Sequence, residues 1–531
     1  MTDRIAAPEL KRMLRDGKEL ALLDVREEGR FAASHLLFAV PIPLSRLELR
    51  IRDLVPRRGT RVVLLDDGDG LAARAAERLA GFGYGNVALL EGGNPAWRAA
   101  GYELFSGMNV PSKAFGEFVE HTYGTPSVSA QELKALLDQR RDLVILDSRP
   151  MEEYSVMNIP GGVDVPGAEL VYRVHELAPD PETLVVVNCA GRTRSIIGAQ
   201  SLINAGIPNK VVALRNGTMG WHLAGLSLER GKRRAAAPPS TKSIEHARLA
   251  AERVAKRFGV RTVDRETLQR WQSEAAQHSL YLLDVRLPEE YEAGHMPGTR
   301  NAPGGQLVQA TDTYIGTRHA RVVLVDDSGV RSTMTASWLI QMGWQNVYVL
   351  DGGFLPYGLE RGPHRPEVPG LDAIRVAEIE AAGLAGRLAG GKGPAVMDLA
   401  RSPDYKRGHI PGAWFAIRSE LPAALQRAGA PAALVLTSPD GTLARLAAPE
   451  AQAAGAAEVL VLRGGTEAWR EAGQPMTEGA ERMASDTLDV FPKPYERDGG
   501  VEAAMKEYLT WEVDLVRQIE ADGDAHFEPY P

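Results

Sequence analysis

Residues 143–150, LVILDSRP, form a short apolar run that ends in Asp147, and Arg149 follows two residues later. An apolar run of this length is typical of a β-strand covered on both faces, as in a parallel sheet between layers of helices. The same pattern occurs three more times along the chain. It stands at residues 20–27 (LALLDVRE), 280–287 (LYLLDVRL) and 394–401 (PAVMDLAR). Successive copies lie 114 to 137 residues apart, so the repeated unit has the size of a domain.

Each copy continues in the same order, with an aromatic turn, a second apolar strand, a helix pattern and a third strand that runs into a glycine turn. One copy reads EEYSVMNIPGG (152–162), TLVVVNC (183–189), SIIGAQSLINAG (195–206) and KVVALRNGTMGW (210–221). Apolar strands that alternate with amphipathic helices are typical of α/β domains. The sequence therefore predicts four tandem α/β domains, each a mostly parallel sheet flanked by helices.

The repeats and the sequences between them divide the chain into seven segments. These are unit 1 (1–107), a linker helix (108–124), unit 2 (125–230), a linker and helix (231–259), unit 3 (260–362), unit 4 (363–478) and a tail (479–531). We expect Ser112 to cap the first linker helix and Gly124 to end it. The tail has thirteen Asp and Glu against five Lys and Arg. Its helix should dock on the chain's own units through an apolar stripe. The stripe is Val501, Ala504, Tyr508, Trp511, Leu515 and Ile519.

The composition fits a soluble globular protein of several domains. Of 531 residues, 44% are hydrophobic and 24% charged, and the net charge of -8 does not indicate nucleic-acid binding. No apolar run reaches the ~18 residues that cross a bilayer, and the N-terminus lacks a signal-peptide pattern. One cysteine, Cys189, excludes an intrachain disulfide and a cysteine-rich zinc site. We expect a cytoplasmic protein without a membrane partner, and the sequence leaves its oligomeric state open.

The loop after the second strand of each unit lies where parallel α/β sheets bind ligands. In unit 2 this loop is Cys189-Ala-Gly-Arg-Thr-Arg-Ser195. The loops of the other units can be aligned with it through the downstream glycine turn. They are Asp66-Asp-Gly-Asp-Gly-Leu-Ala72, Asp326-Asp-Ser-Gly-Val-Arg-Ser332 and Ser438-Pro-Asp-Gly-Thr-Leu-Ala444. Only unit 2 has a thiol there, so units 1, 3 and 4 are expected to be inactive.

The loop of unit 2 has the character of an anion site. Cys189 ends a strand and precedes a helix, and unpaired amides and the helix dipole favour a thiolate or an anionic ligand at a helix N-terminus. Arg192 and Arg194 add cationic donors that suit an oxyanion. We take Cys189 as the catalytic residue. The candidate substrate-binding residues are Ala190, Gly191, Arg192, Thr193, Arg194 and Ser195.

The repeated unit resembles the rhodanese domain of sulfurtransferases, and residues 1–478 resemble a tandem of four such domains. The features that carry the resemblance are the Asp-x-Arg strand end, the E-Y-x-x-G-H-I-P-G turn around His295 and His409, the cysteine loop and the G-G-x-x-x-W turn. Unit 2 departs from the family at Asn158, where His is usual, and at Asn216, where Gly is usual.

Three further residues of unit 2 are candidates for supporting positions behind the loop: Asp147, Arg149 and Trp221. The Asp-x-Arg pair recurs in units 1 and 3, which lack a thiol, so a structural pairing of Asp147 with Arg149 is favoured. Trp221 has counterparts in Trp97, Tyr357 and Trp469, which favours a place in the core. The histidines of the turn, present in the units without a thiol, are interpreted as turn-stabilising.

The resemblance implies a thiosulfate sulfurtransferase. The Cys189 thiolate would attack the outer sulfur of thiosulfate, and the resulting persulfide would pass its sulfur to cyanide or a thiol. No metal or organic cofactor is required for this chemistry. The two arginines beside the thiol should favour thiosulfate, a compact dianion, over mercaptopyruvate.

Two other functions remain open at this stage. A Cys–Arg loop also serves cysteine phosphatases and arsenate reductases, but those loops have five residues between Cys and Arg. Here only four separate Cys189 from Arg194, and no aspartic acid stands in the loop as a general acid. The other alternative is a persulfide carrier or sensor that does not turn over, with the three units that lack cysteine as its scaffold.

Overall fold

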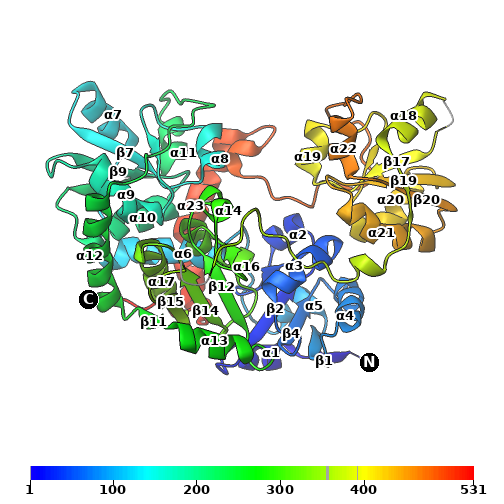
Figure 1. Ribbon diagram of the computed structural model, residues 1–531, viewed down its shortest axis with the longest axis horizontal. Helices are drawn as coiled ribbons and strands as arrows, with labels where there is room; N and C mark the ends of the chain where they lie inside the picture. Colours follow the sequence, from blue (N-terminus) through cyan, green and yellow to red (C-terminus); the bar gives the residue numbers. More distant parts are fainter. Residues whose placement is uncertain (1, 355–357, 391–392, 531) are drawn as a thin grey trace.

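The computed structural model describes residues 2–354, 358–390 and 393–530 and contains the four tandem α/β units that the sequence predicts (Figure 1). Each unit holds a five-stranded parallel sheet with helices on its faces. Numbered along its own unit, the strand order across every sheet is 1-5-4-2-3. The predicted fold class is confirmed.

The elements of the first half of the chain follow the repeated pattern. Unit 1 contains β1 (Asp3–Ile5), α1 (Ala7–Leu14), β2 (Leu20–Asp24), α2 (Glu28–Ala33), β3 (Val40–Pro41), α3 (Leu47–Leu54), β4 (Arg61–Leu65), α4 (Leu71–Gly81), β5 (Val87–Leu90) and α5 (Gly93–Ala99). After the linker helix α6 (Val110–Tyr123), unit 2 contains β6 (Ser127–Val128), α7 (Ala130–Asp138), β7 (Leu143–Asp147), α8 (Met151–Val156), β8 (Val163–Asp164), α9 (Glu169–Leu177), β9 (Leu184–Asn188), α10 (Thr193–Ala205), β10 (Val211–Leu214) and α11 (Gly217–Leu223).

The second half repeats it. After α12 (Thr241–Phe258), unit 3 contains β11 (Arg261–Val263), α13 (Arg265–Ser273), β12 (Leu280–Asp284), α14 (Pro288–Ala293), β13 (Arg300–Asn301), α15 (Gly304–Gln309), α16 (Thr311–Tyr314), β14 (Arg321–Val325), α17 (Val330–Gln341) and β15 (Val347–Leu350). Unit 4 contains β16 (Ala377–Ile379), α18 (Ala381–Ala389), β17 (Ala395–Asp398), α19 (Ser402–Arg407), β18 (Trp414–Phe415), α20 (Leu421–Arg427), β19 (Ala433–Thr437), α21 (Thr442–Ala453), β20 (Glu458–Leu462) and α22 (Gly465–Glu471), and the tail forms α23 (Val501–Asp522).

The first linker helix differs at its start from the prediction that Ser112 caps it. It begins at Val110, with Asn109 as the N-cap residue, and Gly124 ends it in the left-handed conformation as expected. Pro111 suits the first turn, where a missing N–H costs no hydrogen bond. Ser112 lies inside that turn, and its hydroxyl donates to the carbonyl oxygen of Gln309 in unit 3 at 2.5 Å. A contact between units therefore replaces the local cap.

Units 2 and 3 pack closely enough to share a core. The helix α12 lies between α9 of unit 2 and α17 of unit 3, and one buried apolar cluster contains residues of all three (Figure 1). At the seam, a Cβ on Gly304 would lie 2.1 Å from the Thr335 hydroxyl oxygen and 2.8 Å from the Ala168 Cβ. Glycine is therefore required where the two units meet.

Unit 1 contacts unit 3 on one side and unit 4 on the other. The backbones of Leu20 and Arg318 exchange hydrogen bonds between units 1 and 3. Arg418 of unit 4 forms a buried ion pair with Glu48 of unit 1 at 2.8 Å. Unit 4 is otherwise set apart from units 2 and 3 in the ribbon (Figure 1).

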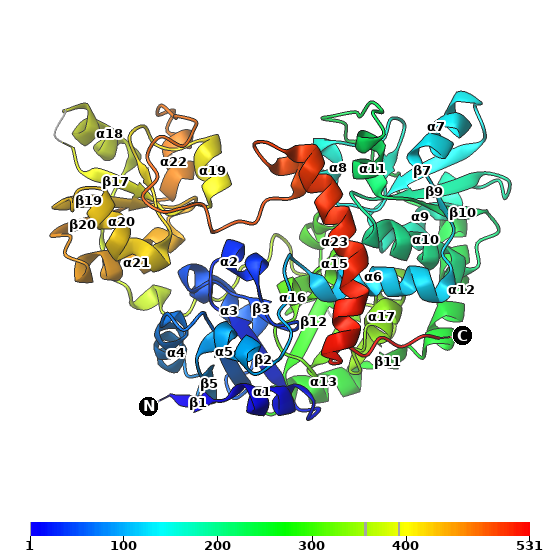
Figure 2. The ribbon, with the colours of Figure 1, turned by 180° about the vertical axis from the view of Figure 1, so that it is seen from behind.

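The tail returns from unit 4 to units 1 and 2, where α23 lies across α6 (Figure 2). Leu515 and Ile519 join a buried cluster with Phe105, while Met505 and Leu509 join one with residues of unit 2. The apolar stripe thus docks on the chain's own units, as expected. Within the described ranges, no helix is long and apolar enough to span a bilayer.

Candidate active site

Cys189 directly follows β9, and its loop leads into α10. The Cys189 side chain is buried, with 2% of its surface exposed. Its thiol donates to the Ser195 hydroxyl oxygen at 3.5 Å, and the Ser195 hydroxyl donates to the carbonyl oxygen of Arg192 at 2.8 Å. Below the loop, Gly217 has a φ of +55°, and a Cβ there would lie 2.3 Å from the Cys189 carbonyl oxygen. Only glycine at 217 lets the turn after β10 support the cysteine loop.

The loops of units 1 and 3 show what this loop can bind. In unit 1 the carboxylate of Asp66, at the position of Cys189, accepts hydrogen bonds from three loop amides at 2.9 to 3.1 Å. The donors are Gly68, Gly70 and Ala72. In unit 3 the Asp326 carboxylate accepts from two loop amides and from the Ser332 hydroxyl. The loop is therefore an anion cradle, and in these two units an internal carboxylate fills it.

Unit 2 has a thiol where units 1 and 3 have this carboxylate, and the acid that approaches its loop, Glu512, comes from the tail. Across the part of the chain that the structure describes, the amides of Gly191, Arg192 and Thr193 have no acceptor. They stand at the N-terminus of α10, a helix of 13 residues, where the dipole and the free amides favour negative charge. The replacement of an aspartate by Cys189 thus leaves the cradle open to a sulfur anion.

The guanidinium of Arg192 is held by the linker helix α6. It donates to both carboxylate oxygens of Glu117, at 2.6 and 2.7 Å, and also pairs with Glu120. Burial raises the pKa of Glu117, and Arg192 only partly opposes this effect. The remaining guanidinium nitrogen of Arg192, Nη1, donates to the side-chain oxygen of Asn216 at 3.3 Å. Asn216 has a φ of 60°, a conformation that asparagine tolerates better than most residues, which accounts for its place where the family has Gly.

The guanidinium of Arg194 faces an acid of its own unit. It donates to both oxygens of Glu153 on α8, at 3.0 and 2.8 Å, and to the side chain of Gln306 in unit 3. Burial would raise the pKa of Glu153, but Arg194 outweighs it and holds that pKa below its ordinary value. Burial would likewise lower the pKa of Arg194, yet Glu153 and Cys189 together raise it. Both loop arginines are therefore paired with acids, and their role in holding a sulfur donor stays a prediction.

Arg149 has a free nitrogen behind the loop. Its Nε and Nη2 donate to Asp147 at 2.8 and 2.7 Å, which is the structural pairing that the repeat favoured. Its Nη1 is buried and has no hydrogen-bond partner among the described residues. In unit 1 the equivalent Nη1, that of Arg26, donates to Asp67 at 2.7 Å. Unit 2 has Ala190 at the position of Asp67, so an unsatisfied cationic donor remains beside the cysteine loop.

The tail helix covers the loop, a contact that the sequence analysis did not predict. A Cβ on Gly191 would lie 3.0 Å from Glu512 Oε2 and 3.4 Å from the ring of Tyr508, both on α23. Glu512 is fully buried, and its Oε1 accepts from Thr193 at 3.2 Å and from Lys113 at 3.0 Å. Burial, together with Glu512, raises the pKa of Tyr508 well above its ordinary value. The helical stripe identified Tyr508 as docking, but no local pattern marks Glu512.

Comparison with known proteins identifies the family of the four units. A family model described as the rhodanese-like domain matches residues 6–100, 129–224, 264–358 and 381–472. The chain belongs to the rhodanese family. The crystal structure of a thiosulfate sulfurtransferase from Pseudomonas aeruginosa is 51% identical, with a TM-score of 0.96 over 100% of both chains.

Shorter relatives match single stretches of the chain. The thiosulfate sulfurtransferase GlpE of Pseudoalteromonas translucida is 29% identical over 75 residues, which are 14% of this chain and 68% of that protein. YrkF of Bacillus subtilis, named as a candidate sulfur carrier protein, is 27% identical over 192 residues, 34% of this chain and 90% of that protein.

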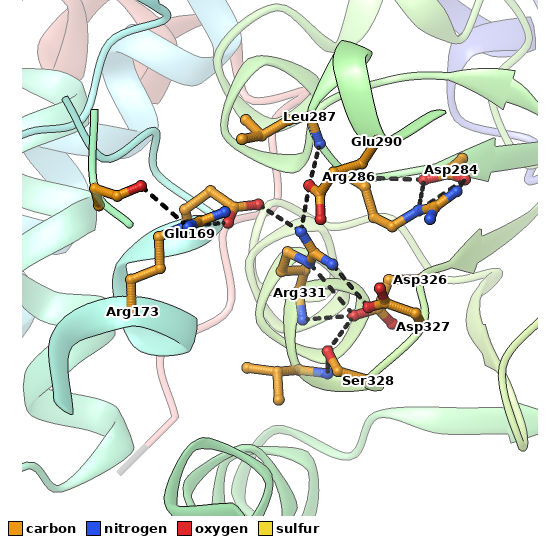
Figure 3. Close-up of polar contacts among 12 residues, drawn as sticks. Glu169, Arg173, Asp284, Arg286, Leu287, Glu290, Asp326, Asp327, Ser328 and Arg331 are labelled. Carbon is orange, nitrogen blue, oxygen red and sulfur yellow. Dashed lines mark hydrogen bonds and ion pairs between the residues drawn. The ribbon is translucent and has the colours of Figure 1, made fainter. Parts of the chain in front are cut away.

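The loop of rhodanese unit 3 is closed by acids (Figure 3). Arg331, at the position of Arg194, is fully buried and pairs with Glu290 at 2.7 Å and Asp327 at 2.7 Å. It also pairs with Glu169 of unit 2 at 2.9 Å, which ties the loop of unit 3 to unit 2. Figure 3 shows these side chains converging on one guanidinium.

The remaining candidates lie in the core. Trp221 is 2% exposed, and its indole N–H donates to the Ser227 carbonyl oxygen at 2.9 Å. Trp97 makes the equivalent bond in unit 1, whereas Tyr357 lies outside the described residues. In the turn of unit 4, the Nδ1 of His409 is hydrogen-bonded to the Tyr405 carbonyl oxygen, as expected for a turn-stabilising residue. In unit 2 the Asn158 amide donates to the corresponding carbonyl oxygen, that of Tyr154.

Proposed function

We propose that this chain is a thiosulfate sulfurtransferase in which Cys189 carries the sulfur as a persulfide. The observation that carries the proposal is the difference between the four loops. Two loops bind an internal carboxylate in the amide cradle, whereas unit 2 has a thiol at that position and an open cradle. The 51% identity over the full chain to a thiosulfate sulfurtransferase supports the donor.

The first step forms a bond between the Cys189 sulfur and the outer sulfur of thiosulfate. The thiolate supplies the electron pair, the sulfur–sulfur bond of thiosulfate breaks, and its electrons leave with sulfite. In the second step cyanide or a thiol attacks the outer sulfur of the persulfide, and the Cys189 thiolate leaves. Each step is a displacement at sulfur, so no external oxidant or reductant is needed.

The cradle and Arg149 would stabilise the charges of these steps. In unit 1 the amides of Gly68, Gly70 and Ala72 bind the Asp66 carboxylate. By the alignment of the loops, the amides of Gly191 and Thr193 would face a persulfide sulfur on Cys189. The free Nη1 of Arg149 offers a charge-assisted hydrogen bond to the oxyanion end of the donor. Arg192 and Arg194, held by Glu117 and Glu153, would act chiefly by shaping the loop.

A transfer assay with thiosulfate and cyanide, run on wild type and Cys189→Ser, tests the proposal. Wild type should turn over and Cys189→Ser should be inactive. Intact-mass analysis after thiosulfate treatment should show one added sulfur per chain, because Cys189 is the only cysteine. Turnover by Cys189→Ser, or stable addition of two sulfurs, would contradict the assignment. Mercaptopyruvate assayed beside thiosulfate checks the donor class.

A persulfide carrier is the second candidate. The burial of Cys189 under α23 and the likeness to YrkF, a candidate sulfur carrier protein, favour it. A carrier would take up one sulfur rapidly from thiosulfate and then show negligible turnover with cyanide or a small thiol. Single-turnover sulfuration measured beside steady-state rates separates the two functions.

A further inference from the structure

A cavity that includes no residue of the cysteine loop lies where units 1 and 3 and the end of the tail meet. Its volume is about 440 Å³, within the ~300–1,000 Å³ typical of small-molecule sites. Residues of all three parts line it, among them Phe38, Trp344 and Phe527. The cavity thus offers aromatic walls on several sides.

Arg318 lines this cavity and, within the described residues, has no anionic group in an ion pair with it. Its guanidinium stacks over the Phe38 ring, 3.5 Å from the ring centroid, and its Nε is fully buried. Among the residues that the structure describes, no side chain or carbonyl forms a hydrogen bond or ion pair with this guanidinium. Burial lowers the pKa of Arg318 to about 10, so the group is still charged at neutral pH. Buried charges in proteins are normally paired, so a guanidinium with a buried, unsatisfied Nε would be stabilised by an anionic ligand.

The backbone fixes Arg318 in this position. Its amide and carbonyl exchange hydrogen bonds with Leu20 of unit 1, at 2.9 and 3.4 Å. The nearest acid of the tail, Asp524, is already neutralised, since it pairs with Lys11 at 2.6 Å and with Arg15 at 2.7 Å. Asp312 and the exposed Glu528 also line the cavity. Burial raises the pKa of Asp312 to about 6, so this carboxylate is mostly ionised at neutral pH, and the cation that acts on it is Arg50. Neither acid forms an ion pair with Arg318 among the described residues. The cation is therefore held in place and left available.

Gln309 supplies a second unsatisfied group to the same cavity. Its side chain is buried, and its Oε1 has no hydrogen-bond donor within the described part of the chain. The Gln309 backbone carbonyl is bound by Ser112, which holds the residue against α6. Gln309 Oε1 and the Arg318 guanidinium line the same cavity, and one ligand that carries both an anionic group and a donor could satisfy the two groups.

We propose that this cavity binds a small organic anion, a carboxylate or phosphate monoester that also carries a hydroxyl or amino group. The anionic group pairs with Arg318, the donor group binds Gln309 Oε1, and the carbon skeleton lies against the aromatic walls. The site is distinct from the Cys189 loop and is independent of the sulfur chemistry.

Calorimetric titration of the full chain with glycerol 3-phosphate and L-malate tests this site, with inorganic phosphate as the bare anion. We expect wild type to bind at least one of the two organic probes with a Kd below about 1 mM, and more tightly than phosphate. Arg318→Met keeps the length and the packing over Phe38 but removes the charge. It should weaken binding about tenfold or more, the effect of losing a charge-assisted hydrogen bond.

Two further variants complete the design. Gln309→Met should weaken the organic probes but leave phosphate unaffected, and it serves as the test if Arg318→Met does not fold. Arg470→Met, at an exposed arginine of unit 4, should bind like wild type. The proposal would be overturned if none of the three probes bound wild type. It would also be overturned if Arg318→Met and Gln309→Met both bound the organic probes as tightly as wild type does.

Discussion

At the scale of the residue, the second position of the loop separates unit 2 from units 1 and 3. Unit 1 has Asp67 there and unit 3 has Asp327, and each carboxylate binds an arginine at 2.7 Å. Ala190 of unit 2 binds none, so the Arg149 Nη1 is free. Because Ala190 stands where units 1 and 3 have an aspartate, the loop of unit 2 has one negative charge fewer at this position.

Ala190→Asp should restore the internal acid and suppress sulfur transfer. The new carboxylate is expected to pair with Arg149, as Asp67 pairs with Arg26, and to repel an anionic donor. We expect kcat/KM for thiosulfate to fall about tenfold to a hundredfold, the loss of one charge-assisted contact. Ala190→Asn is the matched neutral control and should lose much less. Equal losses in the two variants would show that size, not charge, matters at this position.

Asp164 predicts a pH-dependent stability. Burial and the neighbouring Asp147 raise the pKa of Asp164 to about 8, and its Oδ1 has no partner among the described residues. The folded state therefore holds a proton that the unfolded state has released, so stability falls as pH rises from about 4 to about 8. Asp164→Asn removes this cost, which amounts to a few kcal/mol at about 1.4 kcal/mol per pKa unit.

Thermal melting measures this difference. Asp164→Asn should melt close to wild type at pH 4.5 and clearly above it at pH 8.5. Glu182→Gln, at an exposed acid of the same unit, should show no such change between the two pH values. A Tm difference between Asp164→Asn and wild type that does not grow with pH would refute the raised pKa.

At the scale of the element, α6 and α23 complete the active site from outside unit 2. The helix α6 supplies the acids that hold Arg192, and α23 places Tyr508 and Glu512 against Gly191. Neither helix belongs to the repeated unit. The one rhodanese unit with a thiol thus carries two elements that cover it.

Removal of α23 should therefore expose Cys189. A chain that ends at Gly500 is expected to react with iodoacetamide severalfold faster or more, because Tyr508 and Glu512 no longer cover the loop. Tyr508→Ala should show a smaller increase, and Glu507→Gln, on the exposed side of α23, should react like wild type. Unchanged alkylation of the truncated chain would show that α23 does not restrict access to the thiol.

At the scale of the whole molecule, the loops of units 2 and 3 are linked by contacts across the seam between the two units. Glu169 of unit 2 reaches Arg331 in the silent loop of unit 3, and Gln306 of unit 3 accepts from Arg194 in the active loop. The two loops thus contact each other's units across one seam. Around Arg331, acids of unit 3 and Glu169 of unit 2 meet at this interface (Figure 3).

A thiol placed in unit 3 should not restore activity. Asp326→Cys in a Cys189→Ser background is expected to remain nearly inactive, since Asp327, Glu169 and Glu290 still surround Arg331 and repel an anionic donor. Adding Asp327→Ala, which copies Ala190, should recover some sulfuration, measured by intact mass. Activity near wild type from Asp326→Cys alone would show that these acids do not control the loop.

The sequence alone determined the four α/β units and the reactive loop. Both depend on patterns within a few tens of residues: apolar strands, helix periodicity, and Cys189 between a strand and a helix. The position of the thiol at the N-terminus of α10 follows from that order.

Only the tertiary structure decided what surrounds the loop. Glu117 meets Arg192 across 75 residues, and Glu512 meets Thr193 across 319 residues. Arg192 and Arg194 were expected to face the donor, but their guanidinium groups pair with acids, while Arg149 keeps the free nitrogen. Such partners depend on how units and tail pack against one another, and no local periodicity records that packing. The apolar stripe of α23 predicts that the helix docks, but which loop it covers is set by the shapes and charges of surfaces distant in sequence.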